Sequence, residues 1–299
     1  MIETIFSVVF LIQVLRISIP YALPAIGATF SERGGVVNIA LEGILLIAAF
    51  ATTVVTYYTG SPLLGIAAGT VAGIATALLH GLISVTFKAD QIVSGIAINL
   101  FAVGITKFSC QLIFNSSSNS ARIVGMEQWE SLMSVPFLRS PFIPVTVLLL
   151  VISNLVLFRT KFGLRLRAVG EHPEAADTLG VSVGSVRYAG VLISGGFAGL
   201  AGAWLAIDQH SFTDGMSAGR GFIALAAMII GKWSPTGAAG AALLFGLAET
   251  LTIQLQTSSR YLQLIQMIPY VLTMIVLAGF IGRSTPPAAD GVPYEKEAS

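Results

Sequence analysis

Four long stretches of this sequence contain no charged residue, and they constrain the fold more than any other feature. They are residues 43–87, 140–158, 188–207 and 261–282. A helix needs about 20 apolar residues to span the hydrocarbon core of a bilayer, so the longest stretch can hold two crossings and each of the others one. Charged residues make up 10% of the chain, against about 25% in soluble domains. The sequence therefore predicts an all-α polytopic membrane protein.

Hydropathy and helix-breaking residues predict about eight to ten transmembrane helices. The expected crossings are residues 15–31, 36–59, 63–87, 91–114, 141–158, 188–207, 218–232, 236–256 and 261–282. Short loops rich in Lys and Arg stay in the cytoplasm. The basic segment 159–187 is therefore predicted to lie inside and the weakly charged loop 115–140 outside, which puts the N-terminus outside and Lys88 and Lys232 inside.

An internal repeat is indicated by a shift of 173 residues, which lays the Ser-Pro pair at Ser61 over the Ser-Pro pair at Ser234. The shift superposes the first four expected crossings on the last four, and the superposed crossings run in opposite directions. In transporters, such inverted repeats place the substrate path where the two halves meet. The predicted organisation is one transmembrane domain at 1–282, with repeat halves at about 15–114 and 188–282, and a Pro- and charge-rich, disordered cytoplasmic tail at 283–299.

The cytoplasmic segment 159–187 combines a basic start with a helix-starting motif. A turn is expected at Gly170, followed by "HPEAAD", in which Pro173 suits the first helical turn and Glu174 the positive end of the helix dipole. Gly180 is placed to end this helix. A short exposed helix tied to crossings on both sides favours docking of a cytoplasmic partner, and the alternative is an ordinary capped connector.

The stretch "EAADTLG", residues 174–180, resembles the E-A-A-x3-G loop of ATP-binding cassette importer permeases, which docks against the ATPase subunit. The I-x-L-P that follows in that family is replaced here by "GVLISG", as in permeases for simple sugars, branched-chain amino acids and nucleosides. The stretches "SERGGVVNIALEG", "VSGIAINLF" and "GRGFIALAAMIIGKWSPTG" are similar to the nucleoside-type permeases of that group. The resemblance covers about residues 15–282 and assigns coupling to the ATPase to Arg165, Arg167, Glu171, Glu174, Ala175, Ala176 and Gly180.

The resemblance implies a permease subunit of an ATP-driven importer in a bacterial plasma (inner) membrane, moving nucleosides by alternating access. It also implies a separate ATPase that binds ATP and Mg, a second homologous permease chain and an extracytoplasmic substrate-binding protein. One alternative keeps this assembly but carries a simple sugar such as ribose or galactose. Another is an ion-coupled secondary transporter, which is also built from inverted repeats.

The sequence predicts no enzymatic activity and no cofactor or metal in this chain. The Gly-Lys pair of "IIGKWS" lacks the earlier glycine and the adjacent hydroxyl residue of a phosphate-binding loop. His80, His172 and His210 have no Ser, Cys or carboxylate partner at a catalytic spacing. The lone Cys110 argues against an internal disulfide or a cysteine metal site. ATP hydrolysis is therefore assigned to another chain.

Five polar residues within the expected crossings are candidates for the substrate path, because polar groups that face lipid are costly. They are Asn38, Glu42, His80, Asn99 and Glu249. Asn38 and Glu42 lie four residues apart and would share one face of a helix. The resemblance places them in a G-V-V-N-I-x-x-E-G pattern and also matches Asn99. For each of the five, the alternative is a structural role in helix packing.

Charged and polar residues also lie at the ends of the expected crossings. Glu32 and Arg33 are expected to form an ion pair at the inner surface. Asp208, Gln209, His210 and Asp214 are expected in an outer loop, where they are solvated or contact a substrate-delivering protein.

Overall fold

The computed structural model describes residues 7–256 and 285–295, together with residues 267, 271 and 274. Over this part of the chain it is a helical bundle with seven helices that are long and apolar enough to cross a membrane. These are α2 (Val8–Arg33), α3 (Leu41–Thr59), α4 (Pro62–Gly81) continued by the π-helix η1 (Leu82–Thr86), α5 (Gln91–Phe114), α8 (Phe142–Arg159), α11 (Val183–Gln209) and α13 (Pro235–Gln256). The expected crossing at 261–282 lies outside the described residues.

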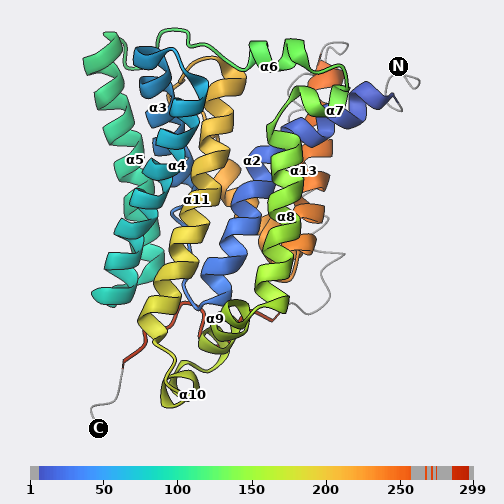
Figure 1. Ribbon diagram of the computed structural model, residues 1–299. Coiled ribbons are helices and arrows are strands. Elements are labelled where there is room, and N and C mark those ends of the chain that lie inside the picture. Colours follow the sequence, from blue (N-terminus) through green and yellow to red (C-terminus); the bar gives the residue numbers. More distant parts are fainter. Residues whose placement is uncertain (1–6, 257–266, 268–270, 272–273, 275–284, 296–299) are drawn as a thin grey trace.

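Short helices mark the two ends of the bundle (Figure 1). At one end, here called the α6 end, lie α6 (Glu127–Leu132) and α7 (Pro136–Arg139). At the other, the α10 end, lie α9 (Lys161–Glu171) and α10 (Pro173–Thr178). Arg33 and Lys232 are at the α10 end, where the Arg33 guanidinium donates to the Lys232 carbonyl at 3.3 Å. The segments predicted to be cytoplasmic are thus gathered at one end.

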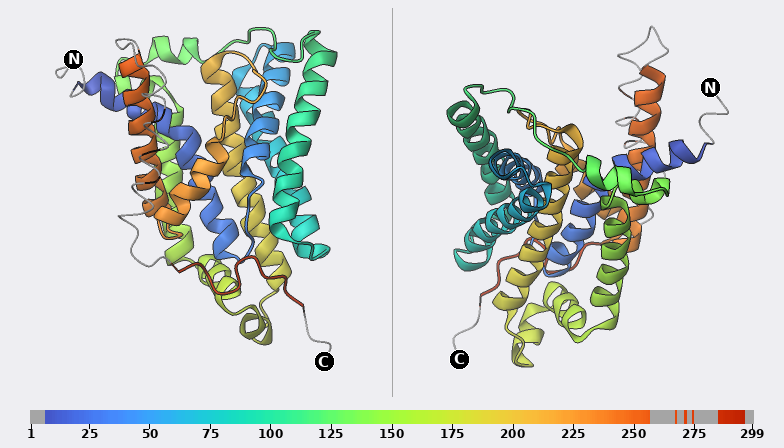
Figure 2. Two further views of the ribbon diagram at one scale, coloured as in Figure 1. Left: turned by 180° about the vertical axis from the view of Figure 1, so that it is seen from behind. Right: turned by 45° about the horizontal axis from the view of Figure 1, so that its top comes forward.

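The contacts of the two long helices in the middle of the bundle mirror each other. The long helices α2 and α11 run in opposite directions and pack against each other in the middle of the bundle (Figures 1 and 2). Helices α3 and α4 of the first half both pack on α11, and α12 (Arg220–Ile230) and α13 of the second half both pack on α2. The contacts of α3 and α4 with α11 therefore correspond to the contacts of α12 and α13 with α2.

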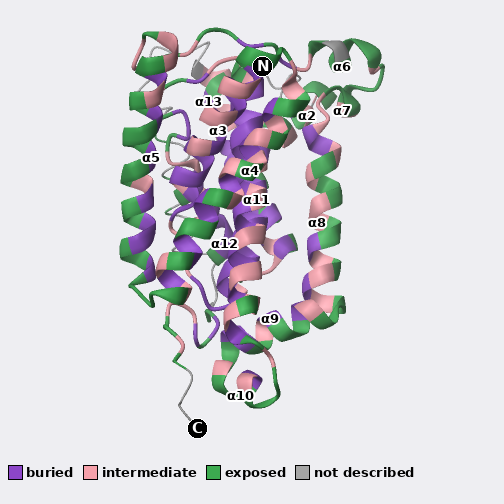
Figure 3. Ribbon diagram, turned by 60° about the vertical axis from the view of Figure 1, so that its left-hand side comes forward, coloured by how far each residue is buried: buried purple, intermediate pink, exposed green. Residues whose placement is uncertain are grey.

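Burial follows this arrangement. Most of α11 and of α2 is buried, whereas α5 and α8 are exposed along their outer faces (Figure 3). Leu100, Phe108 and Leu112 of α5 are among these exposed apolar side chains. Because lipid is as apolar as these residues, their exposure is what a membrane-spanning bundle requires.

The crossing expected at 218–232 is wrong as a full helix. Helix α12 has 11 residues, so at 1.5 Å per residue it is about half as long as the bilayer core is thick. Residues 210–219 before it form turns, with positive φ at Gly215 and Gly219. The crossing expected at 36–59 begins later than expected, because residues 34–40 are non-helical and helix begins only at Leu41. Hydropathy alone does not distinguish a helix from an irregular segment of the same composition.

Small residues allow the central helices to approach closely. A Cβ atom built on Gly73 of α4 would lie 2.5 Å from Cα of Gly199 and 2.6 Å from the carbonyl oxygen of Gly195, both on α11. Contacts of this kind stabilise membrane bundles through van der Waals packing, because lipid provides no hydrophobic force between helices. The α4–α11 interface therefore requires glycine at position 73.

We expect Gly73→Leu to prevent the bundle from packing, because the new side chain would overlap the backbone of α11. The yield of monodisperse protein after detergent extraction should fall at least about 10-fold, as overpacking costs about 1–3 kcal/mol or more. Gly104→Leu is the matched control, since a Cβ at Gly104 on α5 meets no atom within 4 Å. Equal yields for the two variants would contradict this account.

The C-terminal residues 285–295 were expected to be disordered, but the structure places them against the α10 end. We call this segment the C-terminal strap. The Ala289 N–H donates to the Gly170 carbonyl at 2.8 Å, and the Arg187 guanidinium donates to the Val292 carbonyl at 2.9 Å. Pro287 and Ala289 are buried. Composition predicted disorder because it does not account for the free carbonyls of helix ends, which this segment binds.

Candidate functional site

Helix α9 leads from the bundle to the predicted coupling motif. The Thr160 hydroxyl caps its start by accepting from the Gly163 N–H at 3.2 Å. Arg165 is exposed, and the Arg167 guanidinium lies 5.2 Å from the centre of the Phe158 ring. The turn expected at Gly170 is wrong: Gly170 is helical and the chain turns at His172. A Cβ on Gly170 would lie 2.2 Å from the Arg33 carbonyl oxygen, so glycine here lets α9 pack directly on the end of α2.

The predicted motif helix is present as α10, with the expected boundaries. Pro173 is its first residue, and Gly180, with φ of +79°, lies at the turn that leads into α11. Ala176 is buried beneath the helix beside Val169 and Val183. Glu174 and Ala175 face outward and are exposed, as is Glu171 at the end of α9. Helix α10 therefore forms a small projection beyond the membrane-spanning helices, and the cluster under Ala176 supports it.

Glu42 joins the starts of α3 and α12 inside the bundle. Its carboxylate oxygens accept from the N–H groups of Gly219 and Gly221, each at 2.7 Å, at the start of α12. Glu42 is itself in the first turn of α3. A Cβ on Gly221 would lie 2.4 Å from the Glu42 nitrogen, so the starts of α3 and α12 are in contact. One carboxylate therefore neutralises two positive helix ends.

Three other candidates for the substrate path bond to the same region. The Asn99 side chain accepts from the Gly43 N–H at 2.8 Å and donates to the Ile39 carbonyl at 3.0 Å. The two ring nitrogens of His80 lie 3.0 Å from the Ser94 hydroxyl and 2.9 Å from the Val37 carbonyl. The fully buried Asn38 amide donates to the Ser194 hydroxyl at 3.0 Å. These contacts hold the non-helical segment 34–40 in place.

We expect Glu42→Gln to reduce stability more than transport specificity, because the amide retains one acceptor oxygen and no charge. The loss should be about 1–3 kcal/mol, the cost of a lost charged hydrogen bond, and would appear as a lower thermal unfolding temperature in detergent. Asp90→Asn is the control: Asp90 also accepts two N–H groups, from Ile92 and Val93 at 2.9 Å, but at an exposed helix start. Unchanged stability with lost uptake would instead place Glu42 in the substrate path.

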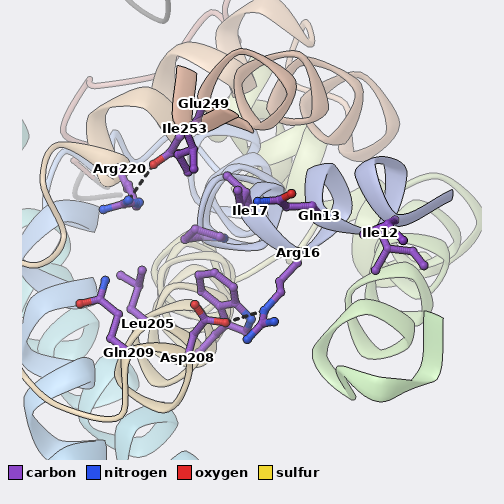
Figure 4. A pocket seen from close by; sticks show the side chains of 13 residues that line it. Ile12, Gln13, Arg16, Ile17, Leu205, Asp208, Gln209, Arg220, Glu249 and Ile253 are labelled. Carbon is purple, nitrogen blue, oxygen red and sulfur yellow. Dashed lines mark hydrogen bonds and ion pairs between the residues drawn. The ribbon is translucent and has the colours of Figure 1, made fainter. Parts of the chain in front are cut away.

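A cavity of 560 Å³ lies between α2, α11, α12 and α13, in the half of the bundle toward the α6 end (Figure 4). Of the five path candidates, Glu249 lines it. Its other polar lining residues are Gln13, Arg16, Asp208, Gln209 and Arg220. The apolar wall includes Ile12, Ile17, Trp204, Leu205 and Ile253. Its volume lies within the range of about 300–1,000 Å³ that is typical of small-molecule sites.

Two ion pairs lie across the cavity from each other. Arg16 of α2 contacts Asp208 of α11 at 2.7 Å, and Arg220 of α12 contacts Glu249 of α13 at 2.9 Å (Figure 4). The Tyr21 hydroxyl donates to the second oxygen of Glu249. The Arg220–Glu249 pair is the more protected, with side chains 18% and 22% exposed. The cavity thus offers hydrogen-bond donors and acceptors without a net charge from these two pairs.

Most residues that line this cavity are not among the five predicted path candidates. Arg16 and Arg220 both lie within expected crossings, and a charged residue inside the membrane is a site hypothesis in itself. Asp208 and Gln209 were expected in an outer loop, but they are near the end of α11 and line the cavity. The loop that follows α11 is paired with the 115–140 loop: the Ser120 N–H donates to the Phe212 carbonyl at 2.9 Å.

Comparison with known proteins identifies relatives over nearly the whole chain. The family described as "Branched-chain amino acid transport system / permease component" matches residues 10–277. A guanosine ABC transporter permease protein of Bacillus subtilis is 41% identical, over 96% of this chain and 98% of its own. A nucleoside ABC transporter permease protein of Lactococcus lactis is 40% identical, over 95% of this chain and 96% of its own.

More distant matches have other cargo names. A Haloferax volcanii protein named "Putative glucose ABC transporter permease protein" is 36% identical, over 79% of this chain and 74% of its own. A solved structure described as "An inward-facing conformation of a putative metal-chelate type ABC transporter" matches 89% of this chain and 83% of its own, with a TM-score of 0.50 and 18% identity. At that identity the likeness concerns the fold alone.

Proposed function

The chain belongs to the family of permease components of branched-chain amino acid transport systems, and on that premise we propose that it is the membrane-spanning subunit of an ATP-binding cassette importer for nucleosides. The observation that supports a nucleoside cargo is the sequence identity of 41% and 40% to guanosine and nucleoside permeases, over at least 95% of the chain. The ATPase is a separate subunit, and this chain is not an enzyme.

The proposed partners follow from the coupling helix and from the family. The α10 end faces the cytoplasm of a bacterial cell, where the ATPase docks on the exposed side of α10, at Glu174 and Ala175. A second permease chain supplies a second docking helix, and an extracytoplasmic binding protein delivers cargo at the α6 end. The basic residues of the 159–187 segment support this orientation, because they favour the cytoplasmic side.

The proposed mechanism uses the fixed attachment of the coupling helices. Helix α9 packs on the end of α2, and α10 leads through Gly180 into α11. Arg16 on α2 and Asp208 on α11 face each other at the cavity. A movement that the ATPase imposes on α10 therefore changes the position of α2 relative to α11. This change alters the access to the cavity between them. Such a two-state rearrangement is what alternating access requires.

The cavity suits an uncharged cargo rich in hydrogen-bonding groups. Arginine and carboxylate side chains bond to the edges of nucleobases, and the same groups bond to sugar hydroxyls. In the proposed site, cargo hydroxyl and N–H groups donate to Asp208 or Glu249, and cargo oxygens accept from Arg16 or Arg220. In this site each arginine remains beside its paired carboxylate. The release of a neutral cargo therefore leaves no unpaired charge in a medium of low polarity, which would be costly.

A simple-sugar cargo remains the second candidate, since the glucose-named relative is 36% identical. Uptake of radiolabelled guanosine, uridine, ribose, glucose and leucine by cells carrying the complete transport system tests both. We expect the cells to take up the nucleosides. Unlabelled guanosine should block this uptake, and ATP depletion should reduce it. Uptake of ribose or glucose that guanosine does not compete with would contradict the nucleoside assignment and identify a sugar as the cargo. Uptake of leucine would contradict it in the same way and identify an amino acid.

A further inference from the structure

The C-terminal strap bonds to several elements that the proposed mechanism moves. On α9, the Glu171 carboxylate accepts from the Ala288 N–H at 3.2 Å, and Gly170 accepts from Ala289 at 2.8 Å. On α11, Arg187 donates to the Val292 carbonyl. The strap therefore connects the last turn of one coupling helix to the first turns of a central helix.

The strap also touches the end of α2 and the non-helical segment that follows it. A Cβ on Gly35, where φ is +84°, would lie 3.0 Å from the Ala289 carbonyl oxygen. The Asp290 carboxyl shares a hydrogen bond with Glu32. Glu32 in turn accepts from the Trp233 indole N–H at 2.6 Å, and Arg33 donates to the Trp233 carbonyl at 2.9 Å. Glu32 and Arg33 thus bind other partners in place of the expected ion pair with each other.

Beneath α10, the ring of Tyr294 completes a small hydrophobic cluster. The cluster consists of Val169 of α9, Ala176 of α10 and Val183 of α11, with Tyr294 packed against them. Ala176 is the buried residue of the coupling motif, so the strap contacts the motif from below. The neighbouring strap contact is different in kind: Glu295 pairs with Lys88 at 3.1 Å, with side chains 77% and 41% exposed.

We propose that the C-terminal strap is a positioning element of the transport cycle, which fixes α9 and α10 to the ends of α2 and α11 so that the coupling helices and the central helices move as one body. The inference rests on the proposed function, because it presupposes that an ATPase moves α10. Without the strap, α10 would still be present and could still dock. Its motion would reach α2 and α11 less completely.

The test compares cargo transported with ATP hydrolysed in liposomes containing the complete assembly, with the chain shortened to residue 284. The number of nucleosides moved per ATP should fall at least about 5-fold, the lower range of typical coupling free energies, while the ATPase rate stays within about 2-fold of wild type. Glu295→Gln is the control and should leave the ratio unchanged, because exposed ion pairs contribute about 0–1 kcal/mol.

Point variants separate positioning from folding. Tyr294→Ala should lower the same ratio, and Tyr294→Phe should lower it less, because the phenylalanine keeps the ring that packs against the cluster under α10. If the shortened chain fails to assemble, these two variants decide the matter. An unchanged ratio in Tyr294→Ala would overturn the proposal. A wild-type assembly that moves no nucleoside on ATP would instead refute the proposed function, independently of the strap.

A pH profile tests whether the Asp290 carboxyl contributes to the attachment of the strap. Burial raises the pKa of the Asp290 carboxyl from 3.8 to about 7, against the opposing effects of the bond with Glu32, of the Arg187 charge and of the Gly291 N–H. The charged groups that face Asp290 are therefore Glu32 of α2 and Arg187 of α11, while Glu171 of α9 binds the adjacent Ala288.

Strap attachment should weaken as the pH rises. Well below pH 3.8 the carboxyl is neutral whether the strap is attached or detached, and between pH 3.8 and about pH 7 mainly the detached strap carries the charge, which favours detachment. Amide exchange at Ala289, corrected for intrinsic rates, should therefore quicken from pH 5 to pH 7 in the wild type and quicken less in Asp290→Asn, where only Glu32 is left to titrate at this contact. Equal pH dependence in both proteins would remove Asp290 from the proposal.

Discussion

Replacing Glu174 by Arg is expected to abolish nucleoside uptake while the chain still reaches the membrane. Glu174 is exposed in the first turn of α10, so the substitution removes no buried contact of the bundle. It places a positive charge at the positive end of a helix dipole and reverses the charge of the proposed docking face. Unfavourable charge contacts in an interface cost several kcal/mol, so uptake should fall at least about 10-fold.

The measurement is uptake of radiolabelled guanosine by cells with the complete transport system, normalised to the chain recovered in membranes. Glu295→Arg provides the matched control, because it makes the same charge reversal at an exposed position outside α10, where the side chain is 77% exposed. Uptake that survives Glu174→Arg but collapses with a proton or sodium gradient would identify an ion-coupled transporter and refute the docking role of α10.

Removing the Arg220 side chain is expected to have a comparably large effect, for a different reason. In Arg220→Ala, Glu249 keeps the hydrogen bond from Tyr21 but loses its counter-ion at 2.9 Å. Breaking a buried ion pair by removing one partner costs about 3–5 kcal/mol, and the partial exposure of 18% and 22% makes this an upper bound here. We expect uptake to fall at least about 10-fold, with a lower thermal unfolding temperature in detergent.

A double variant distinguishes stability from cargo binding. Replacing both partners, in Arg220→Gln with Glu249→Gln, removes the uncompensated charge, so stability should largely return. Uptake should stay low if these charges bind the cargo. Lys107→Ala is the control, because its pair with Asp214 is exposed at 53% and 27% and contributes about 0–1 kcal/mol. A double variant that transports normally would limit the pair to a structural role.

The coupling motif could be predicted because its signals are local. A proline at the start of a helix, acidic residues in the first turn and a glycine after the end act through neighbouring backbone groups. Helix α10 accordingly begins at Pro173 and ends before Gly180, as expected. Gly170 is the exception, because its role depends on the Arg33 carbonyl of another helix. No spacing within the motif contains that information.

The path candidates had a different outcome, because a polar residue in a crossing does not specify its partner. Glu42 bonds to the start of α12, 177 residues away, and Asn38 to a hydroxyl 156 residues away. Of the five candidates, Glu249 alone is among the residues that line the cavity between α2, α11, α12 and α13. Its partner Arg220 carries a signal of its own, as a charged residue within the expected crossing at 218–232, but no spacing in the sequence indicates that it pairs with Glu249 of another helix.

The sequence by itself determined that this chain lies in a membrane, which end of it is basic, and where the coupling helix begins and ends, because apolar length, charge and helix capping act locally. The tertiary structure decided which polar groups support the starts of α3 and α12, which meet across a cavity, and that the C-terminal strap is packed. Each of these depends on donors and acceptors that folding brings together from distant segments, since buried polar groups must find partners wherever the fold provides them.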